Sequence, residues 1–257
     1  SVRTLRLCMH EHYEDCPWRE QALYGNDARN QMLCGYYAFD ERNRMPELSL
    51  ELLARGLRPD GWLEMCMPAR FPLTIPSFTF CWVLSVEDNL RHRGNVEFTR
   101  TLMPVVGRIL DARVAEMRDG LLPCPAGEGY WQFYEWSEGL NGERGVRKGE
   151  VRYESPLNLF FILALESAAR CADATGDGER AGRWRDAAAL VRKETTRRFW
   201  NGKSGCLEFD SDGKTKPAEL VQALALLAHV IPDGARASVA RKLSQRSEWT
   251  ETTLSQS

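Results

Sequence analysis

The chain lacks the short motifs that identify several large enzyme classes. Its 257 residues contain no G-x-S-x-G nucleophile elbow, no phosphate-binding glycine loop and no dinucleotide fingerprint. No apolar run approaches the ~20 residues that span a bilayer, and no signal peptide is visible at the start. A basic surplus is also missing, since the formal net charge is −2. We therefore expect a globular protein with neither a membrane nor a nucleic acid as its partner.

The eight cysteines and four histidines show no metal-binding pattern. No two cysteines form a C-x-x-C pair, and several lie among apolar residues, as Cys81 does in "FTFCWVL". We expect buried free thiols rather than disulfides, which favours a reducing compartment such as the cytoplasm. His10 and His12 are two positions apart, so on a helix they do not share a face. No metal and no other cofactor is expected.

Helical periodicity dominates the sequence. One segment starts at Ser155, which is expected to cap a helix with Pro156 in its first position, and Gly176 ends it. Asp177 is expected to cap the next helix. The other helical patterns cover residues 27–39, 48–57, 75–93, 96–118, 217–231 and 233–244. The sequence predicts one all-α domain over residues 1–257, with about four helical hairpins and a small β-hairpin at 205–213.

Two long connections interrupt the helices, at residues 58–76 and 121–154. Loops of this length in a compact helical protein are either functional or disordered. The second is too aromatic for disorder, because it carries Tyr130, Trp131, Phe133, Tyr134 and Trp136. We expect it to form an ordered wall.

A first group of candidate site residues lies in "YEDCPWREQALYGNDAR", residues 13–29. Helix capping explains its acids one at a time: Asp15 suits an N-cap with Pro17 after it, Asp27 suits the next N-cap, and Glu20 suits a first helical turn. Taken together, the three acids and Arg19 are expected to raise the pKa of one carboxyl group while Arg19 keeps another ionised. That arrangement serves a general acid beside a carboxylate that binds substrate.

A second group lies in "YWQFYEWSEG", residues 130–139. Trp131 and Trp136 offer flat apolar faces that suit the C–H side of a sugar ring, and Glu135 can accept hydrogen bonds from its hydroxyl groups. The alternative is that these aromatic residues belong to the core. Convergence of Asp15, Glu20, Asp27 and Trp136 on one cavity distinguishes a sugar site from capping and core packing.

The stretch "DCPWREQALYGNDAR" resembles the signature of bacterial α-L-rhamnosidases with a six-hairpin (α/α)6 catalytic barrel. The resemblance continues through "IPSFTFCWVLSVEDNLRHRGN", which is similar to an inner barrel helix, and "YWQFYEWSEGL", which is similar to a tryptophan loop. Two later helices, "SPLNLFFILALESAARCADATGD" and "KPAELVQALALLAHVI", extend it over nearly the whole chain. The resemblance implies an incomplete (α/α)6 toroid.

The resemblance also implies roles for these residues. Glu20 is then the general acid that protonates the glycosidic oxygen of a terminal α-L-rhamnoside. The residues that hold the sugar are Asp15, Arg19, Asp27, Glu135, Trp136 and Trp131. Two departures affect the sugar subsite: Glu135 stands where the family usually has Asp, and Tyr24–Gly25 replaces a common Gly-Trp pair.

Members of this family invert the anomeric centre, which requires a second carboxylate roughly 6.5–9.5 Å from the first to activate water. Neither Glu248 nor Glu251 has the sequence context expected of that base. We expect the base, the remaining hairpins and accessory β domains to lie in a longer parent chain, and residues 1–257 alone to be inactive. Two alternatives stay open: a six-hairpin enzyme for another sugar, and a catalytically inactive carbohydrate-binding protein.

Overall fold

Nine helices dominate the part of the chain that the computed structural model describes, which is residues 2–69, 71–210, 215–245 and 249–252. They are α1 (Val2–Leu7), α2 (Gly25–Ala38), α3 (Met45–Ala54), α4 (Pro76–Arg93), α5 (Val96–Glu116), α6 (Ser155–Thr175), α7 (Gly178–Phe199), α8 (Glu219–Leu227) and α9 (Asp233–Ser244). Two short antiparallel pairs join β1 (Leu23–Tyr24) to β2 (Cys66–Met67) and β3 (Trp200–Asn201) to β4 (Cys206–Leu207). In the described ranges, no helix has both the length and the apolar character that crossing a membrane requires.

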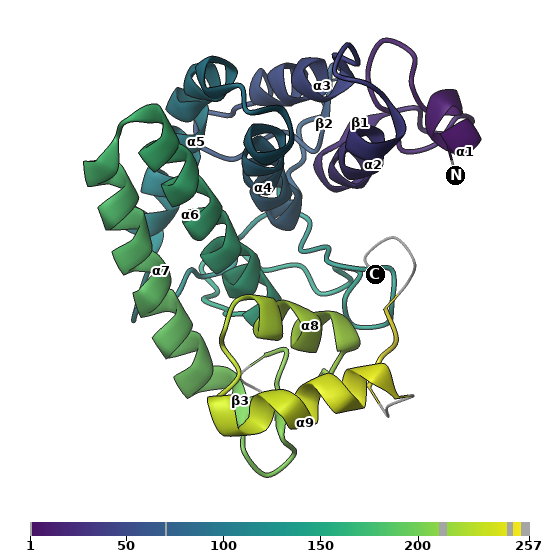
Figure 1. Ribbon diagram of the computed structural model, residues 1–257. Helices are drawn as coiled ribbons and strands as arrows, with labels where there is room; N and C mark the ends of the chain where they lie inside the picture. The colour runs from purple at the N-terminus through teal and green to yellow at the C-terminus, as the bar shows by residue number, and fades with distance from the viewer. Residues whose placement is uncertain (1, 70, 211–214, 246–248, 253–257) are drawn as a thin grey trace.

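The helices form an open arc of four hairpins (Figure 1). Along the inner side, α2, α4, α6 and α8 each contact the next, while α3, α5, α7 and α9 each pack against the inner helix before them. The predicted all-α fold and incomplete toroid are confirmed. The inner helices α4 and α6 are buried over most of their length, and in α4 every residue from Pro76 to Asn89 is buried. The outer helix α7 instead buries one stripe, which includes Ala181, Trp184, Ala188 and Val191.

The sequence located the helix ends to within a few residues. Gly176 ends α6 in the left-handed conformation at φ 90°, and Asp177 caps α7 by accepting a hydrogen bond from the Arg180 amide at 3.1 Å. Both predictions are confirmed. Ser155 is not a cap, because α6 begins at Ser155 itself and its hydroxyl donates to the Glu208 carbonyl. The predicted helix at 48–57 lies at Met45–Ala54, and the one at 217–231 is shorter, Glu219–Leu227.

The short strands differ most from the sequence prediction. The expected β-hairpin at 205–213 pairs Cys206–Leu207 with Trp200–Asn201 upstream, and residues 211–213 lie outside the described residues. The pairing of β1 with β2 was not predicted, because two-residue strands are too short to show an alternating pattern. This pairing attaches the motif segment to the connection at 58–76.

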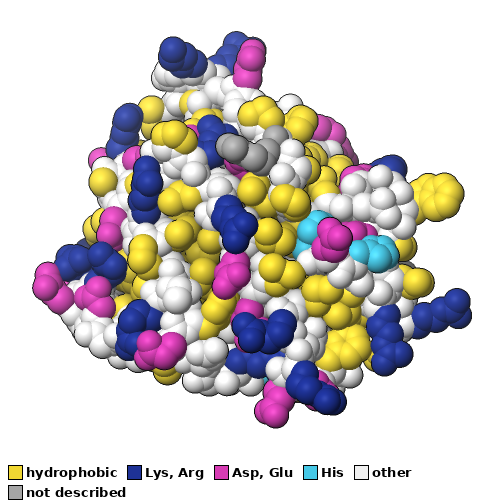
Figure 2. Space-filling view, turned by 90° about the horizontal axis from the view of Figure 1, so that it is seen from above, with side chains coloured by type: hydrophobic (Ala, Val, Ile, Leu, Met, Phe, Trp, Pro, Cys, Tyr) yellow, Lys and Arg dark blue, Asp and Glu magenta, His cyan; other side chains and the backbone are white. Residues whose placement is uncertain are grey.

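The cysteines are free thiols, as expected. Six of them are buried: Cys8, Cys66, Cys81, Cys124, Cys171 and Cys206. On the face seen from above, basic and acidic side chains are interspersed (Figure 2). This mixture agrees with the near-neutral net charge.

The start of α2 passes so close to α4 that only glycine fits there. A Cβ atom added to Gly25 would lie 2.7 Å from the backbone oxygen of Phe78. Gly25→Ala is therefore expected to lower the free energy of unfolding by about 1–3 kcal/mol, measured by urea denaturation.

Gly182→Ala is the matched control for this prediction. Gly182 lies inside α7 with nothing within 4 Å of an added Cβ atom, so alanine there is expected to stabilise the protein by about 0.5–1 kcal/mol. Equal effects of the two substitutions would contradict the close approach of α2 to α4.

Candidate functional site

The motif segment before α2 is a closed loop rather than a helix. The Asp15 amide donates to the Ala22 carbonyl at 3.0 Å, and the Asp15 Oδ1 accepts from the Ala22 amide at 2.9 Å. Gln21 has a φ of 49°, which a helix does not allow. The capping explanations of Asp15 and Glu20 are therefore wrong, because the carboxylate of Asp15 closes the loop and Glu20 lies within it.

Asp27 lies in the first turn of α2, but it is not the cap. The helix begins at Gly25, and Tyr24 occupies the cap position. An acid in a first turn interacts favourably with the positive end of the helix dipole. The β1–β2 pair and the contact of Gly25 with Phe78 fix this turn next to the start of α4.

A cavity of about 600 Å³ lies between the loop, the starts of α2 and α4, and the connection at 121–154. This volume is within the range of small-molecule sites. Its lining residues are Asp15, Cys16, Trp18, Arg19, Glu20, Tyr24, Asn26, Asp27, Ile75, Phe78, Trp131, Phe133 and Trp136. Six of the seven predicted site residues thus share one cavity, which favours a binding site over separate helix caps.

Glu135 is the exception among the predicted site residues. Its side chain is fully buried, and its Oε1 accepts a hydrogen bond from the Trp136 amide at 2.6 Å. It is not among the residues that line the cavity. The expectation that Glu135 binds sugar hydroxyls is corrected, because its carboxylate turns inward and holds the backbone of the loop that presents Trp136.

The carboxyl groups of the cavity differ in their affinity for protons. The Arg19 Nε donates to the Glu20 Oε1 at 2.6 Å and the Cys16 thiol donates to the Glu20 Oε2 at 3.2 Å, and together they lower the pKa of Glu20 to about 2. Burial raises the pKa of Asp27 to about 6, with smaller contributions from the negative charges of Asp15 and Glu20. The predicted contrast is confirmed, with Asp27 as the raised carboxyl and Glu20 as the one that Arg19 keeps ionised.

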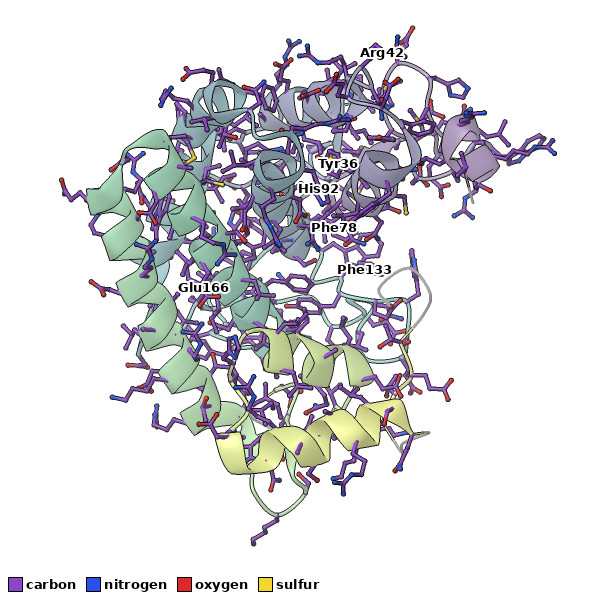
Figure 3. All side chains as sticks on the ribbon, viewed as in Figure 1. Tyr36, Arg42, Phe78, His92, Phe133 and Glu166 are labelled. Atoms are coloured by element: carbon purple, nitrogen blue, oxygen red, sulfur yellow. The ribbon has the colours of Figure 1, made fainter. Side chains whose placement is uncertain are left out.

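Aromatic side chains from α4 and from the connection at 121–154 also line the cavity. Phe78 and Phe133 meet edge to face with their ring centroids 6.0 Å apart, and Figure 3 shows them reaching across the gap between α4 and the loop below it. The Phe133 ring lies 4.8 Å from that of Trp136, which is 64% exposed. The Ser77 hydroxyl donates to the Phe133 carbonyl at 2.7 Å and fixes the loop to α4. The connection at 121–154 is therefore an ordered wall, as the sequence predicts.

The aromatic residues of this connection divide between the wall and the core. Trp131, Phe133 and Trp136 line the cavity, whereas Tyr134 is buried and its hydroxyl donates to Glu154 at 2.7 Å. The aromatic segment thus divides between cavity lining and core, and sugar binding by Trp131 and Trp136 stays a prediction.

Sequence reasoning missed several residues of the cavity. Phe78 was assigned to a helix without a site role, although its place in the first turn after Pro76 is a signal that it lies near the helix end. Trp18 lies in the motif between Pro17 and Arg19, but the sequence gives it no site role. The positions of Cys16, Tyr24 and Asn26 depend on the loop closure by Asp15, which the sequence did not reveal.

In the part of the chain that the structure describes, one group of donor atoms lies close enough to meet at a metal ion, those of Asp15, Cys16 and Glu20, within 4.8 Å of one another. The Glu20 carboxylate in this group is already engaged by Arg19. His10 and His12 do not join the group, because the His10 Nδ1 is 2.9 Å from Glu14 and the His12 Nδ1 is 2.9 Å from the Tyr13 carbonyl.

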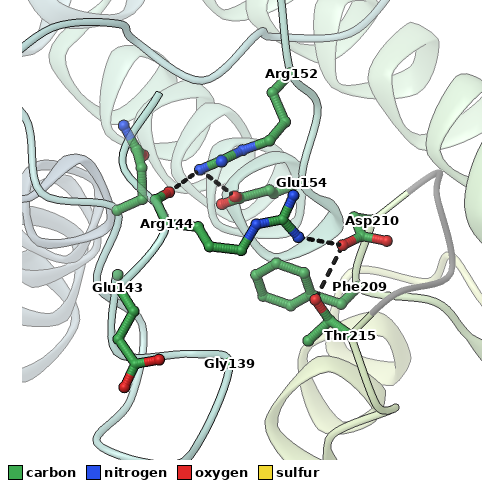
Figure 4. Close-up of a pocket in the computed structure, with 10 residues that line it drawn as sticks. Gly139, Glu143, Arg144, Arg152, Glu154, Phe209, Asp210 and Thr215 are labelled. Carbon is green, nitrogen blue, oxygen red and sulfur yellow. Dashed lines mark hydrogen bonds and ion pairs between the residues drawn. The ribbon is translucent and has the colours of Figure 1, made fainter. Parts of the chain in front are cut away.

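A smaller cavity of about 60 Å³ lies beside the start of α6 (Figure 4). Its charged residues interact with one another: Arg152 pairs with Glu154 at 2.8 Å, Arg144 lies 3.8 Å from Asp210, and the Thr215 hydroxyl donates to Asp210 at 2.9 Å. Burial raises the pKa of Glu154. Such mutual pairing is typical of a buried structural network.

The fold is similar to those of solved rhamnosidases. The GH78 family rhamnosidase of Bacillus sp. GL1 is 26% identical, with a TM-score of 0.87 over 98% of this chain and 26% of that one. A rhamnosidase from Klebsiella oxytoca with rhamnose bound is 19% identical, with a TM-score of 0.81 over 98% of this chain and 47% of that one. The α-L-rhamnosidase from Aspergillus terreus is 14% identical, with a TM-score of 0.67 over 93% and 27%.

The chain spans about a quarter to a half of the length of these proteins. No curated protein matches its sequence significantly. Residues 1–256 match the family described as the bacterial alpha-L-rhamnosidase 6 hairpin glycosidase domain. The chain therefore belongs to this family of six-hairpin glycosidase domains.

Proposed function

We propose that this chain supplies the rhamnose-binding and general-acid part of an enzyme that hydrolyses terminal α-L-rhamnosides with inversion. The observation that carries this proposal is that three carboxyl groups and Arg19 line one cavity together with aromatic rings. Flat aromatic surfaces and convergent polar groups are the two elements that bind a sugar. Membership of the family and the rhamnosidase neighbours support the same substrate class.

In this proposal the polar side of the cavity holds the sugar and delivers the proton. Asp15, Arg19 and Asp27 bind the rhamnose hydroxyls, while the rings of Trp131 and Trp136 pack against the sugar. Glu20 donates its proton to the glycosidic oxygen as the bond to the anomeric carbon breaks. Glu135 acts indirectly, because it orients the backbone that carries Trp136.

Glu20 must be protonated to act as an acid, and its ion pair with Arg19 opposes this. We infer that a bound substrate engages Arg19 and removes water from the carboxyl group, both of which raise the pKa of Glu20. The second candidate for the acid is Asp27, because its pKa of about 6 already favours the protonated form near neutral pH.

The general base is proposed to come from outside residues 1–257. The carboxyl groups among the described residues that line the cavity, those of Asp15, Glu20 and Asp27, already have roles. We further propose that these residues form a single domain, the N-terminal part of a six-hairpin catalytic domain whose remaining hairpins complete the site. The alternative is a carbohydrate-binding protein without activity. The presence of a general base would distinguish the enzyme from this alternative.

The missing base gives the first test. The 257-residue chain is expected to bind L-rhamnose but to leave 4-nitrophenyl α-L-rhamnoside intact, since no group activates water. Added azide needs no base, so it is expected to displace 4-nitrophenol and give β-L-rhamnosyl azide, identified by nuclear magnetic resonance. Turnover in water without azide would place the base inside this chain, and failure to bind rhamnose would overturn the proposed function.

A comparison of two substrates with different leaving groups identifies the residue that acts as the general acid. In the presence of azide, Glu20→Gln is expected to slow the cleavage of phenyl α-L-rhamnoside about 10²–10⁴-fold. The same substitution is expected to have little effect on the cleavage of the 2,4-dinitrophenyl rhamnoside, because that leaving group needs no proton. Asp27→Asn is expected to weaken both reactions equally through sugar binding. Glu179→Gln, an exposed acid on α7, serves as the control. The opposite pattern would assign the acid to Asp27.

The raised pKa of Asp27 also predicts a pH-dependent stability. The folded chain holds the Asp27 proton up to about pH 6, whereas the unfolded chain releases it near pH 4, so stability is lost as the pH rises between these values. Asp27→Asn removes this loss. The free energy of unfolding of Asp27→Asn, relative to that of wild type, is expected to be about 2 kcal/mol higher at pH 8 than at pH 4, measured by urea denaturation.

Asp233→Asn is the control for the pH dependence. Asp233 also lies in a first helical turn, but its side chain is 98% exposed, so burial does not penalise its charge. An Asp27→Asn effect that stays constant between pH 4 and pH 8 would contradict the buried character of the Asp27 carboxyl.

A further inference from the structure

The two long connections between the helices meet at one point beside the cavity. Thr74 of the first connection forms an isolated parallel bridge with Tyr130 of the second. The Thr74 amide donates to the Gly129 carbonyl at 3.0 Å, and the Trp131 amide donates to the Thr74 carbonyl at 2.8 Å. Ile75 and Trp131 directly follow the two bridge residues, and both line the cavity. The bridge therefore brings one residue of each connection into the cavity lining.

The side chains of the two bridge residues have their partners on the far side of the bridge. Successive side chains of an extended segment point to opposite sides. The buried Thr74 hydroxyl donates to the Leu63 carbonyl at 2.8 Å, and the Tyr130 hydroxyl donates to the Asp60 Oδ2 at 2.7 Å. Neither bridge residue lines the cavity. The bridge is therefore held by contacts on the side that faces away from the cavity.

Arg58 joins the two connections on this far side. Its Nη1 donates to the Thr74 Oγ1 at 3.0 Å and to the Gly129 carbonyl at 3.3 Å, and its Nη2 donates to the Asp60 Oδ2 at 2.8 Å. The Cζ of its guanidinium also lies 5.2 Å from the centroid of the Tyr130 ring. The Arg58 side chain is 21% exposed, so these contacts are largely shielded from water. A planar fork that stacks on a ring makes such a set of contacts, and a lysine ammonium does not.

Other contacts hold the Trp131 region, but they act at different points. The Trp131 Nε1 donates to the Asn141 carbonyl at 2.8 Å, which orients the ring within its own connection. The Ser77 hydroxyl attaches this connection to α4 at the Phe133 carbonyl, two residues beyond Trp131. At Trp131 itself the attachment is the bridge, whose two hydrogen bonds oppose the entropy of closing a long loop. Arg58 adds contacts to both connections at that point.

We propose that Arg58 is a positioning residue of the sugar site and that it acts through the bridge to hold the Trp131 ring against the sugar. This inference rests on the proposed function, in which Trp131 packs against rhamnose. Arg58 does not line the cavity, so it touches neither the sugar nor a reacting atom. The four residues that its guanidinium engages lie between helices, so we expect the helices to keep their arrangement without it.

The affinity of the 257-residue chain for L-rhamnose, measured by isothermal titration calorimetry, tests this inference. Arg58→Met keeps the apolar stem and removes the guanidinium, and it is expected to weaken rhamnose binding about threefold to tenfold. Arg58→Lys is expected to recover part of the affinity, and it replaces Arg58→Met in every comparison if that variant does not fold. In a Trp131→Ala background, Arg58→Met is expected to have less than about a twofold further effect, because the ring that Arg58 positions is gone.

Arg180→Met is the matched control, since Arg180 has similar contacts away from the cavity. Its side chain is 31% exposed, its guanidinium lies 5.7 Å from the Trp184 ring centroid, and its Nη1 is 3.5 Å from the Asp177 Oδ2. Both Arg58→Met and Arg180→Met are expected to lower the free energy of unfolding, measured by urea denaturation. Only Arg58→Met is expected to change the rhamnose affinity of the folded chain.

Two results would overturn the positioning role and leave the proposed function standing. One is an unchanged rhamnose affinity in the folded Arg58 variant. The other is an Arg58→Met effect of undiminished size in the Trp131→Ala background, which would show that Arg58 does not act through that ring. Wild type that fails to bind rhamnose would overturn the proposed function and this inference with it.

Discussion

The burial of α4 from Pro76 to Asn89 is the constraint on which the rest of the structure depends. Two acids near its C-terminal end would be costly inside the protein, but each has a basic partner on a neighbouring inner helix. Arg29 of α2 donates to Asp88 at 2.8 Å, and Arg170 of α6 donates to both oxygens of Glu87 at 2.6 and 2.7 Å. These paired groups fix α2 and α6 against α4 in one register. The same register places the start of α2 beside the start of α4, where the cavity lies.

The cavity has two sides because two kinds of structure meet there. The loop before α2 is closed by hydrogen bonds between Asp15 and Ala22, and it supplies charged groups that remain close to water. The connection at 121–154 is fixed to α4 through Ser77 and Phe133, and it supplies rings. A sugar has polar hydroxyl groups and apolar C–H faces, so such a two-sided cavity matches both parts of its surface.

Much of the fold could be predicted from the sequence, because hydrophobic periodicity, Gly176 and Asp177 act over a few residues. The gathering of Asp15, Glu20, Asp27 and Trp136 was also within reach, through the resemblance of the motif. The burial of the Glu135 side chain could not be predicted from the sequence. In an irregular loop no period assigns one residue to the core and the next to the surface. An acid before a proline suits both a helix start and a closed loop, so the sequence alone did not distinguish these two structures for Asp15.

The distance along the chain between the two walls of the cavity has a consequence for folding. The helical hairpins form from neighbouring segments, whereas the cavity brings together residues as far apart in the chain as Asp15 and Trp136. Closing the longer loop between them costs more entropy. The helical frame is expected to be in place before the cavity exists.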